Sequence, residues 1–264
     1  MFQHHAESIE KLIGYFKGKD GVVALVLGGS VAKGTARPDS DIDATAVVTD
    51  EKYAELAAQN KFAEVITGFC TYAGGYFDIK YKTKAFLREA ALRGSEPTRN
   101  AYVKARVLFS DDEEIAPLIG RIAEYPEHER EKKIRCFNAN LQLNQNYFLN
   151  CVPPSNAYMR AHLAQEIVYS VYRLILIENR VLFPSNRRLE ETVRACPHRP
   201  KDILERGAAF LKDVSPETCG NFVDAFRAQT ALSLSDDINE NCSQYVKYYE
   251  DWWREEHPPL PNEW

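Results

Sequence analysis

The sequence has no long apolar run, no paired cysteines and no excess of basic side chains. A membrane-spanning helix needs about 18 consecutive apolar residues, and no stretch approaches that length. The six cysteines show no Cys-x-x-Cys spacing, so neither a zinc knuckle nor a dithiol redox motif is expected. The first residues also lack the basic-then-apolar layout of a signal peptide. We therefore expect a cytoplasmic chain without a membrane segment.

The chain is mildly acidic, with 33 Lys+Arg against 38 Asp+Glu and a formal net charge of −5. Proteins that bind a long phosphate backbone usually carry a basic excess, because counterion release drives that binding. This balance disfavours a polynucleotide partner and suits a small or cationic one. The length of 264 residues is enough for two modest domains.

Apolar patterning divides the chain into an α/β part and an all-helical part. Residues 7–17 place apolar side chains at helical spacing. Strands are expected at residues 22–27, 42–48 and 76–82, and further helices at 51–66, 84–93 and 97–105. After about residue 116 the strand patterns disappear. Long helices are expected there at residues 129–149, 156–180, 186–195, 200–212, 216–232 and 240–255. We therefore predict one domain over residues 1–116 and a helical domain over 117–264.

A glycine pair follows the first predicted strand directly. Gly28 and Gly29 permit a tight backbone, and Ser30 begins a short helix, so N–H groups and the hydroxyl can surround phosphate oxygens. Asp41 and Asp43 lie two residues apart in the next strand, so both carboxylates point to one face. A divalent cation that bridges a polyphosphate requires hard oxygen ligands of this kind.

A further acid lies in the third predicted strand. Tyr76, Asp78 and Lys80 share one face of that strand. Asp78 could therefore lie beside Asp41 and Asp43 across the sheet. Three carboxylates around two Mg²⁺ ions would serve a two-metal phosphoryl transfer, in which one ion activates the attacking hydroxyl and the other steadies the triphosphate.

The combined pattern resembles a known family. Gly-Gly-Ser, then Asp-x-Asp in a strand, then a later Asp resembles the DNA polymerase beta-like nucleotidyltransferase superfamily, over about residues 20–112. The version Gly-Gly-Ser-x-Ala-x-Gly-Thr-Ala-x-x-x-Ser-Asp-x-Asp is most similar to small bacterial members, which include aminoglycoside and lincosamide nucleotidyltransferases. The resemblance implies an α+β fold: a mixed sheet with flanking helices, followed here by an all-α helical bundle that would bind the acceptor.

The resemblance also implies roles for individual residues. Asp41 and Asp43 would hold both metal ions, and Asp78 would hold one and could accept the acceptor proton. The nucleotide would be bound by Gly28, Gly29, Ser30, Lys33 and Ser40. For Lys33 an ordinary surface lysine is the alternative, and for Ser40 the alternative is a simple turn residue.

Two helical segments of the second domain carry unusual polar residues. His162, Gln165, Glu166, Tyr169 and Arg173 form a polar stripe at helical spacing. Some antibiotic nucleotidyltransferases use a glutamate of the helical domain as general base, so Glu166 is a catalytic candidate; the alternative is a solvated helix face with Glu166 paired to a neighbour. Four asparagines also fall within nine residues, at positions 138, 140, 144 and 146. They would either bind a polar acceptor or join helices internally.

These observations predict an enzyme. It would be a Mg²⁺-dependent nucleotidyltransferase that moves AMP from ATP, or the equivalent from another nucleoside triphosphate, to a hydroxyl of a small molecule and releases pyrophosphate. The acceptor, such as an aminoglycoside-like or lincosamide-like antibiotic in antibiotic resistance, would bind between the two domains. The alternatives are a protein or RNA acceptor, as in regulatory or toxin-antitoxin members, and a non-catalytic nucleotide-binding module. A homodimer is left open, as is the choice of Asp78 or Glu166 as base.

Overall fold

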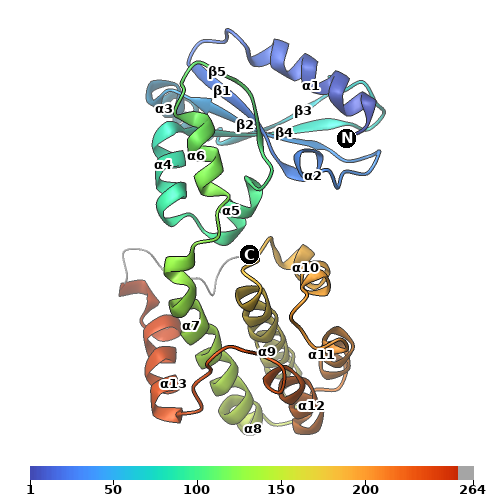
Figure 1. The fold of residues 1–264 in the computed structure, drawn as a ribbon, viewed down its shortest axis with the longest axis vertical. Coiled ribbons are helices and arrows are strands. Elements are labelled where there is room, and N and C mark those ends of the chain that lie inside the picture. Colours follow the sequence, from blue (N-terminus) through green and yellow to red (C-terminus); the bar gives the residue numbers. More distant parts are fainter. Residues whose placement is uncertain (255–264) are drawn as a thin grey trace. The chain divides into compact units, whose positions relative to one another are not determined.

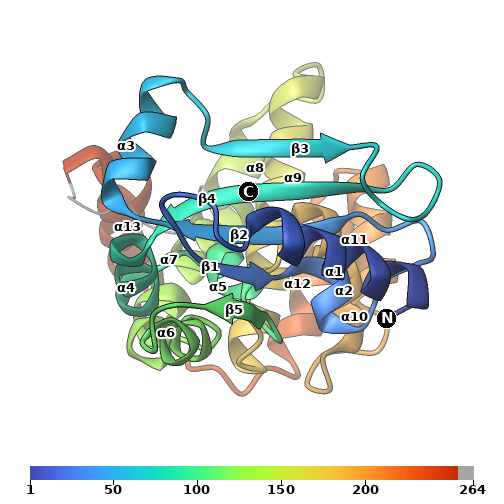
Figure 2. The same cartoon turned by 90° about the horizontal axis from the view of Figure 1, so that it is seen from above.

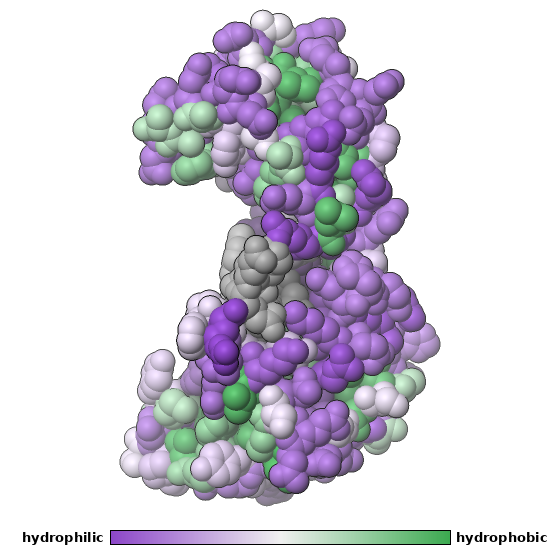
Figure 3. All heavy atoms as spheres, turned by 90° about the vertical axis from the view of Figure 1, so that its left-hand side faces the viewer, coloured by the Kyte–Doolittle hydropathy of each residue, from purple (hydrophilic) through white to green (hydrophobic). Residues whose placement is uncertain are grey.

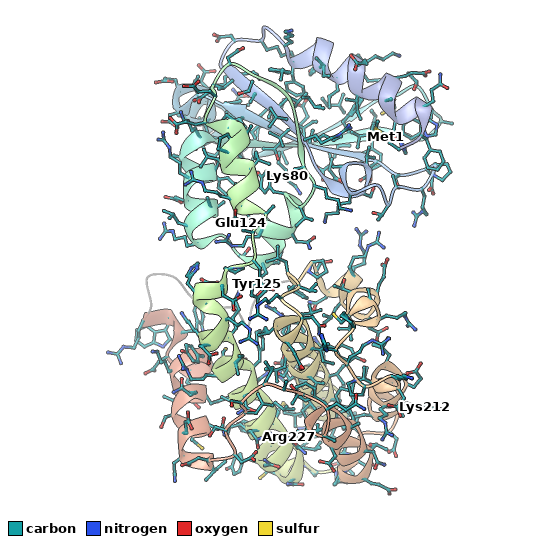
Figure 4. All side chains as sticks on the ribbon, viewed as in Figure 1. Met1, Lys80, Glu124, Tyr125, Lys212 and Arg227 are labelled. Atoms are coloured by element: carbon teal, nitrogen blue, oxygen red, sulfur yellow. The ribbon has the colours of Figure 1, made fainter. Side chains whose placement is uncertain are left out.

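The structure, a computed structural model, describes residues 1–254. It divides into two compact units, with the division between Glu124 and Tyr125, both labelled in Figure 4. The sequence places this boundary after residue 116, which lies inside helix α6 (Ile115–Ile122). Helix α6 packs against helix α4 (Lys84–Arg93) and belongs to the core of the first unit. The first unit therefore extends to Glu124.

The first unit is built on a five-stranded mixed sheet. Its strands are β1 (Val22–Leu27), β2 (Ile42–Val48), β3 (Ala63–Thr67), β4 (Tyr76–Thr83) and β5 (Arg106–Ser110). They lie in the order β3-β4-β2-β1-β5, which Figure 2 shows from above. Strands β2 and β4 run parallel, whereas the other neighbours run antiparallel. The predicted α+β class, a mixed sheet with flanking helices and a helical second part, is confirmed.

Helices cover both faces of this sheet (Figure 1). Helix α1 (Gln3–Phe16) packs one apolar stripe, Ile9, Leu12 and Phe16, against one face. Helices α4 and α6 pack on the opposite face, together with Tyr102, which follows helix α5 (Glu96–Ala101). Because side chains alternate along a strand, the apolar residues of each central strand are divided between these two core clusters.

The predicted helix over residues 51–66 is wrong in its second half. Helix α3 (Asp50–Ala58) ends early, and Asn60 takes a left-handed backbone conformation with φ of 54°. Strand β3 follows and pairs antiparallel with β4. It contains Val65, Ile66 and Thr67, whose branched side chains favour a strand. Pairing with β4 therefore decides the structure of a segment whose apolar spacing alone is compatible with a helix.

The second unit is all-helical over its described residues. Its α-helices are α7 (Arg130–Leu143), α8 (Leu149–Cys151), α9 (Ala157–Glu178), α10 (Leu189–Ala195), α11 (Ile203–Lys212), α12 (Pro216–Arg227) and α13 (Ile238–Tyr245). A π-helical segment, Asn144–Phe148, joins α7 to α8. Helix α9 forms the centre, because every residue from Val171 to Ile177 is buried and α7, α10, α11 and α12 contact it. Burial on all sides over two turns identifies α9 as the core helix of this unit.

Apolar residues are largely collected in the core clusters of the two units. On the face shown in Figure 3, hydrophilic residues predominate and hydrophobic ones form small separate areas. None of the helices in residues 1–254 combines the length and the apolar character that crossing a membrane requires.

Candidate active site

Strands β2 and β4 bring the three predicted aspartates together. The two strands pair in parallel, with Asp43 directly opposite Asp78. Asp41 lies one residue before β2 and, because strand side chains alternate, points to the same side as Asp43. The intervening Ile42 and the residue opposite it, Phe77, are buried in the α1 cluster. The carboxylates therefore lie on the face of the sheet that is turned away from α1.

Helix α2 (Gly29–Lys33) follows β1 and lies against Asp43. The Gly28 N–H donates a hydrogen bond to the backbone carbonyl of Asp43 at 2.9 Å. Gly29 has a left-handed φ of 62°, and a Cβ at this position would overlap the Asp43 carboxylate. Both the conformation and the close approach therefore require glycine. Ser30 lies in the first turn of α2, where helical N–H groups have no partner within their own helix.

The carboxyl of Asp43 lies among like charges. Burial raises the pKa of Asp43 above its ordinary value, and the charge of Asp41 raises it further. Asp78 acts in the same direction, whereas the ammonium groups of Lys80 and Lys33 lower this pKa. The lysines offset the repulsion only in part, and a bound cation would relieve the remainder.

The donor chemistry of the site fits a divalent cation, because three carboxylates supply hard oxygen ligands. In the conformation described, no three His, Cys, Asp or Glu side chains of residues 1–254 lie close enough together to hold a metal ion. Two of the aspartates have further polar neighbours. Asp41 is hydrogen-bonded with Tyr76, which raises the pKa of that tyrosine, and Asp78 Oδ2 lies 4.0 Å from Lys80 Nζ.

Two lysines lie beside the aspartates. Lys33 Nζ donates to Asn100 Oδ1 of α5 at 2.6 Å, and the side chain is half-buried next to Asp43. Lys33 is therefore partly buried and hydrogen-bonded, and its role at a nucleotide stays a prediction. Lys80, labelled in Figure 4, lies on β4 two residues after Asp78 and on the same face. Period-two spacing reveals Lys80 in the sequence, but nothing local reveals Asn100, because its contact with Lys33 spans 67 residues.

Ser40 closes the turn that precedes Asp41. Its Oγ accepts a hydrogen bond from the Arg37 N–H at 2.9 Å, and its own N–H donates to the Arg37 carbonyl at 3.1 Å. The carbonyl of Ser40 accepts a hydrogen bond from the Tyr72 hydroxyl at 2.6 Å. The hydroxyl of Ser40 thus stabilises the turn that presents Asp41, which is one of the roles that the sequence leaves open.

Glu166 lies in α9 of the second unit and has a neighbour on α7. Asn140 Nδ2 lies 2.9 Å from Glu166 Oε2 and 2.9 Å from Ser170 Oγ. Asn138 Nδ2 donates to Asn241 Oδ1 of α13 at 3.0 Å. These asparagines are buried and join α7 to α9 and α13, so the internal role is the one that the structure supports. Glu166 is half-buried and paired with a neighbour, and its catalytic role stays a prediction.

The predicted polar stripe on α9 is wrong at Arg173. This side chain is fully buried, with its guanidinium 4.5 Å from the ring centre of Phe137 and 4.2 Å from that of Phe183. Arg173 Nη1 also donates to the Tyr169 hydroxyl at 2.5 Å. Aromatic faces attract a guanidinium, which explains a core arginine that helical spacing places on a polar face. Gln165 and Tyr169 line an open pocket of about 260 Å³ between α9, α10 and α11.

Comparison with known proteins identifies the first unit. Residues 9–92 match the family model for a nucleotidyltransferase domain. The chain carries a nucleotidyltransferase domain. It is therefore an enzyme of the nucleotidyltransferase class, and the match covers β1 to α4 with Asp41, Asp43 and Asp78.

Two solved structures are similar to the chain at low identity. A nucleotidyltransferase-like protein from Exiguobacterium sibiricum is 10% identical, with a TM-score of 0.49, over 98% of this chain and 83% of that one. A spectinomycin adenyltransferase, AAD(9), from Enterococcus faecialis, solved with ATP and spectinomycin, is 14% identical, with a TM-score of 0.31, over 91% of this chain and 96% of that one. A search of curated protein sequences finds no match.

Proposed function

We propose that the chain transfers a nucleoside monophosphate from a nucleoside triphosphate to a hydroxyl group of a small molecule, with ATP as the donor. The observation that carries the proposal is the pairing of Asp43 with Asp78, beside the Gly29 backbone, inside the nucleotidyltransferase domain. Nucleotidyl transfer in general follows from the domain. The donor, the metal ions and the acceptor are the content of this proposal.

Asp41, Asp43 and Asp78 are the residues that would hold two Mg²⁺ ions. When bound, Mg²⁺ supplies charge neutralisation for the triphosphate and lowers the pKa of the attacking hydroxyl. The crowding of negative charge around Asp43 supports this assignment, because it favours a cation at the carboxylates.

The nucleotide phosphates bind along helix α2. The Gly29 N–H and the Ser30 hydroxyl bind phosphate oxygens, and Lys33 supplies a positive charge at the end of the same helix. Gly28 contributes by joining this backbone to β2, because its own N–H donates to the Asp43 carbonyl. Ser40 contributes through the turn that presents Asp41. The close approach of Gly29 to Asp43 supports this placement, because it brings the phosphate-binding backbone next to the metal-binding carboxylate.

The reaction forms one bond and breaks one bond. The acceptor oxygen attacks the α-phosphorus in line, and the bond from the α-phosphorus to the oxygen bridging to the β-phosphate breaks, so that pyrophosphate leaves. The hydroxyl proton passes to a carboxylate, either Asp78 in the first unit or Glu166 in the second. Asp78 is on the sheet face that carries the other carboxylates, and Glu166 is held in place by Asn140.

The helical unit provides the acceptor site in this proposal. Gln165 and Tyr169 lie on the polar side of α9 and line a pocket with Glu190 and Leu211, a mixture of polar, aromatic and apolar groups that suits a small hydroxylated molecule. The acidic balance of the chain disfavours a polynucleotide acceptor. The similarity of the glycine and aspartate pattern to antibiotic nucleotidyltransferases supports an aminoglycoside-like or lincosamide-like antibiotic as the acceptor.

The proposal is tested with the purified chain, α-³²P-labelled nucleoside triphosphates, MgCl₂ and a panel of aminoglycosides and lincosamides. We expect pyrophosphate release and label transfer that depend on one acceptor class and stop on addition of EDTA. Asp43→Asn removes a proposed metal ligand and abolishes both signals. Asp39→Asn is the matched control, because Asp39 is an exposed carboxylate two residues before Asp41 that pairs only with Arg37 among the ion pairs of residues 1–254.

Retention of pyrophosphate release in Asp43→Asn would show that the proposed mechanism is wrong. Label transfer to a protein or RNA of a cell extract, with no small molecule modified, would show that the acceptor is a macromolecule and not the proposed small molecule. Calorimetric binding of Mg-ATP without turnover over the whole panel would instead support a non-catalytic nucleotide-binding module.

A further inference from the structure

Tyr72 connects the beginnings of the two strands that carry the aspartates. Its hydroxyl donates to the Ser40 carbonyl at 2.6 Å, and Ser40 directly precedes Asp41. Its ring packs on the backbone of Gly75, where an added Cβ would lie 2.6 Å from the ring carbon Cζ. Gly75 directly precedes β4 and lies three residues before Asp78. One side chain therefore contacts both polypeptide segments that lead into the site.

His4, in the first turn of α1, also contacts the turn that precedes Asp41. Its Nε2 lies 2.9 Å from the Pro38 carbonyl, and since a carbonyl can only accept, this nitrogen carries the hydrogen. The His4 ring also packs against Tyr72, with ring centres 4.6 Å apart. His5, whose side chain is fully buried, packs edge-on against Tyr72 at 5.1 Å.

The first turn of α1 is also bonded to the loop that contains Tyr72. The Thr71 N–H donates to Ser8 Oγ at 3.0 Å, and Thr71 Oγ1 donates to the His4 carbonyl at 2.9 Å. Ser8 is fully buried. Helix α1 therefore fixes the 70–75 loop and the turn before β2 relative to each other, although neither segment is its neighbour in sequence.

We propose that Tyr72 and His4 form a clamp that sets the separation of Asp41 and Asp78 for binding of divalent cations and triphosphate. The inference rests on the proposed function, and both residues are positioning residues, since neither touches the reacting groups. Metal ligands must be held to within about 0.5 Å of the productive geometry, and three carboxylates at the beginnings of two strands repel one another. The Tyr72 hydroxyl is the donor in its bond to Ser40, because a carbonyl can only accept.

The test compares two tyrosine variants that lose one hydroxyl each. Tyr72→Phe removes the donor to Ser40, whereas Tyr81→Phe removes the donor to Glu64 Oε2, a hydrogen bond of 2.7 Å on the opposite face of β4. Binding of Mn²⁺ alone is measured by electron paramagnetic resonance, and kcat and KM for ATP are measured with Mg²⁺. Mutation of a residue that holds metal ligands in place, without binding the metal itself, typically weakens metal binding by about 10- to 100-fold. We expect Tyr72→Phe to weaken Mn²⁺ binding about tenfold and to lower kcat, while Tyr81→Phe changes only the melting temperature.

A second pair of variants tests the clamp through His4. His4→Ala removes the donor to the Pro38 carbonyl, and His4→Gln returns an N–H group near the position of Nε2. We expect His4→Ala to weaken Mn²⁺ binding and His4→Gln to restore it. Equal Mn²⁺ affinity in Tyr72→Phe and Tyr81→Phe, with Asp43→Asn still defective, would overturn the clamp and leave the proposed function standing. Absence of Mn²⁺ binding in the unaltered chain would overturn both.

Discussion

Gly29 and the carboxylate of Asp43 occupy adjoining space, and no side chain larger than hydrogen fits between them. The φ of Gly29 is 62°, and a Cβ built there would overlap Asp43 Oδ2. The Gly28 N–H meanwhile donates to the Asp43 carbonyl. The proposed phosphate-binding end of α2 and the proposed metal ligand are therefore fixed to each other through backbone, so a change at one must displace the other.

Gly29→Ala is expected to lower kcat for nucleotidyl transfer by about 10- to 100-fold, because loss of the groups that position a metal ligand has an effect of that size. The left-handed conformation adds a cost of about 1–2 kcal/mol to folding. Gly18→Ala is the matched control: Gly18 has φ of 80° and no atom within 4 Å of an added Cβ. It should lose stability alone, as measured by thermal unfolding beside the turnover assay. Equal activity losses in the two variants would contradict this explanation.

Lys33→Met is expected to raise KM for ATP about tenfold with a smaller effect on kcat. The change keeps the apolar stem and removes the ammonium group that donates to Asn100 and lies beside Asp43. A hydrogen bond to a charged group contributes about 1.5–3 kcal/mol, and about 1.4 kcal/mol corresponds to a tenfold change in affinity. Lys61→Met is the control, since Lys61 pairs with Glu64 away from the aspartates. KM for ATP is measured in both variants by steady-state kinetics over a range of ATP concentrations. An unchanged KM in Lys33→Met would show that this lysine does not bind the nucleotide.

The aspartate arrangement could be predicted from sequence because it depends on local rules. Alternation along a strand puts Asp41 and Asp43 on one face, and Asp78, in the third predicted strand, lies opposite Asp43 once β2 and β4 pair. The contacts around these residues depend instead on tertiary structure. Tyr72 meets Ser40 across 32 residues, and Lys33 meets Asn100 across 67. No periodicity links such positions, so sequence patterns do not reveal them.

Glu166→Gln separates the catalytic role of Glu166 from its structural one. The amide oxygen of glutamine can still accept the hydrogen bond from Asn140, so folding should be preserved. If Glu166 is the general base, kcat falls by about 10²- to 10⁴-fold while the melting temperature stays within a few degrees. Glu217→Gln, on an exposed position of α12 away from the pocket, is the control. Full activity in Glu166→Gln together with loss of activity in Asp78→Asn would assign the proton to Asp78.

Helix boundaries were predicted well where capping and apolar spacing agree, and poorly where side chains act over a distance. The predicted helix at 84–93 matches α4 (Lys84–Arg93), whose N-cap Thr83 accepts from the Phe86 N–H. Arg173 shows the opposite case, since its burial between Phe137 and Phe183 follows from packing of α7 and the segment after α9. Spacing places a polar residue on a face of its own helix, and only the neighbouring elements decide what covers that face.

Arg99 is a buried residue whose role also depends on neighbouring elements. It is 2% exposed, and its guanidinium donates to carbonyls at the ends of two helices: Gly94 and Leu92 at the end of α4, and Ile122 at the end of α6. These carbonyls have no partners within their own helices, and a positive charge at a helix C-terminus is favourable. Arg99→Lys keeps the charge, but a single ammonium group cannot reach both helix ends. We expect the first unit to lose about 3 kcal/mol of stability, measured as a fall in melting temperature of roughly 10 °C.

Arg99→Lys should also weaken nucleotide binding at the proposed site, because Asn100, the partner of Lys33, is the next residue of α5. If Arg99 holds α5 in place, Arg99→Lys raises KM for ATP as Lys33→Met does, at temperatures where the unit remains folded. Arg88→Lys is the control, since Arg88 is an exposed arginine of the same unit that pairs with Glu114 at 2.8 Å, and exposed pairs contribute little to stability. An unchanged KM in Arg99→Lys with a lowered melting temperature would confine Arg99 to the core, and equal melting temperatures in the two variants would contradict its role at the helix ends.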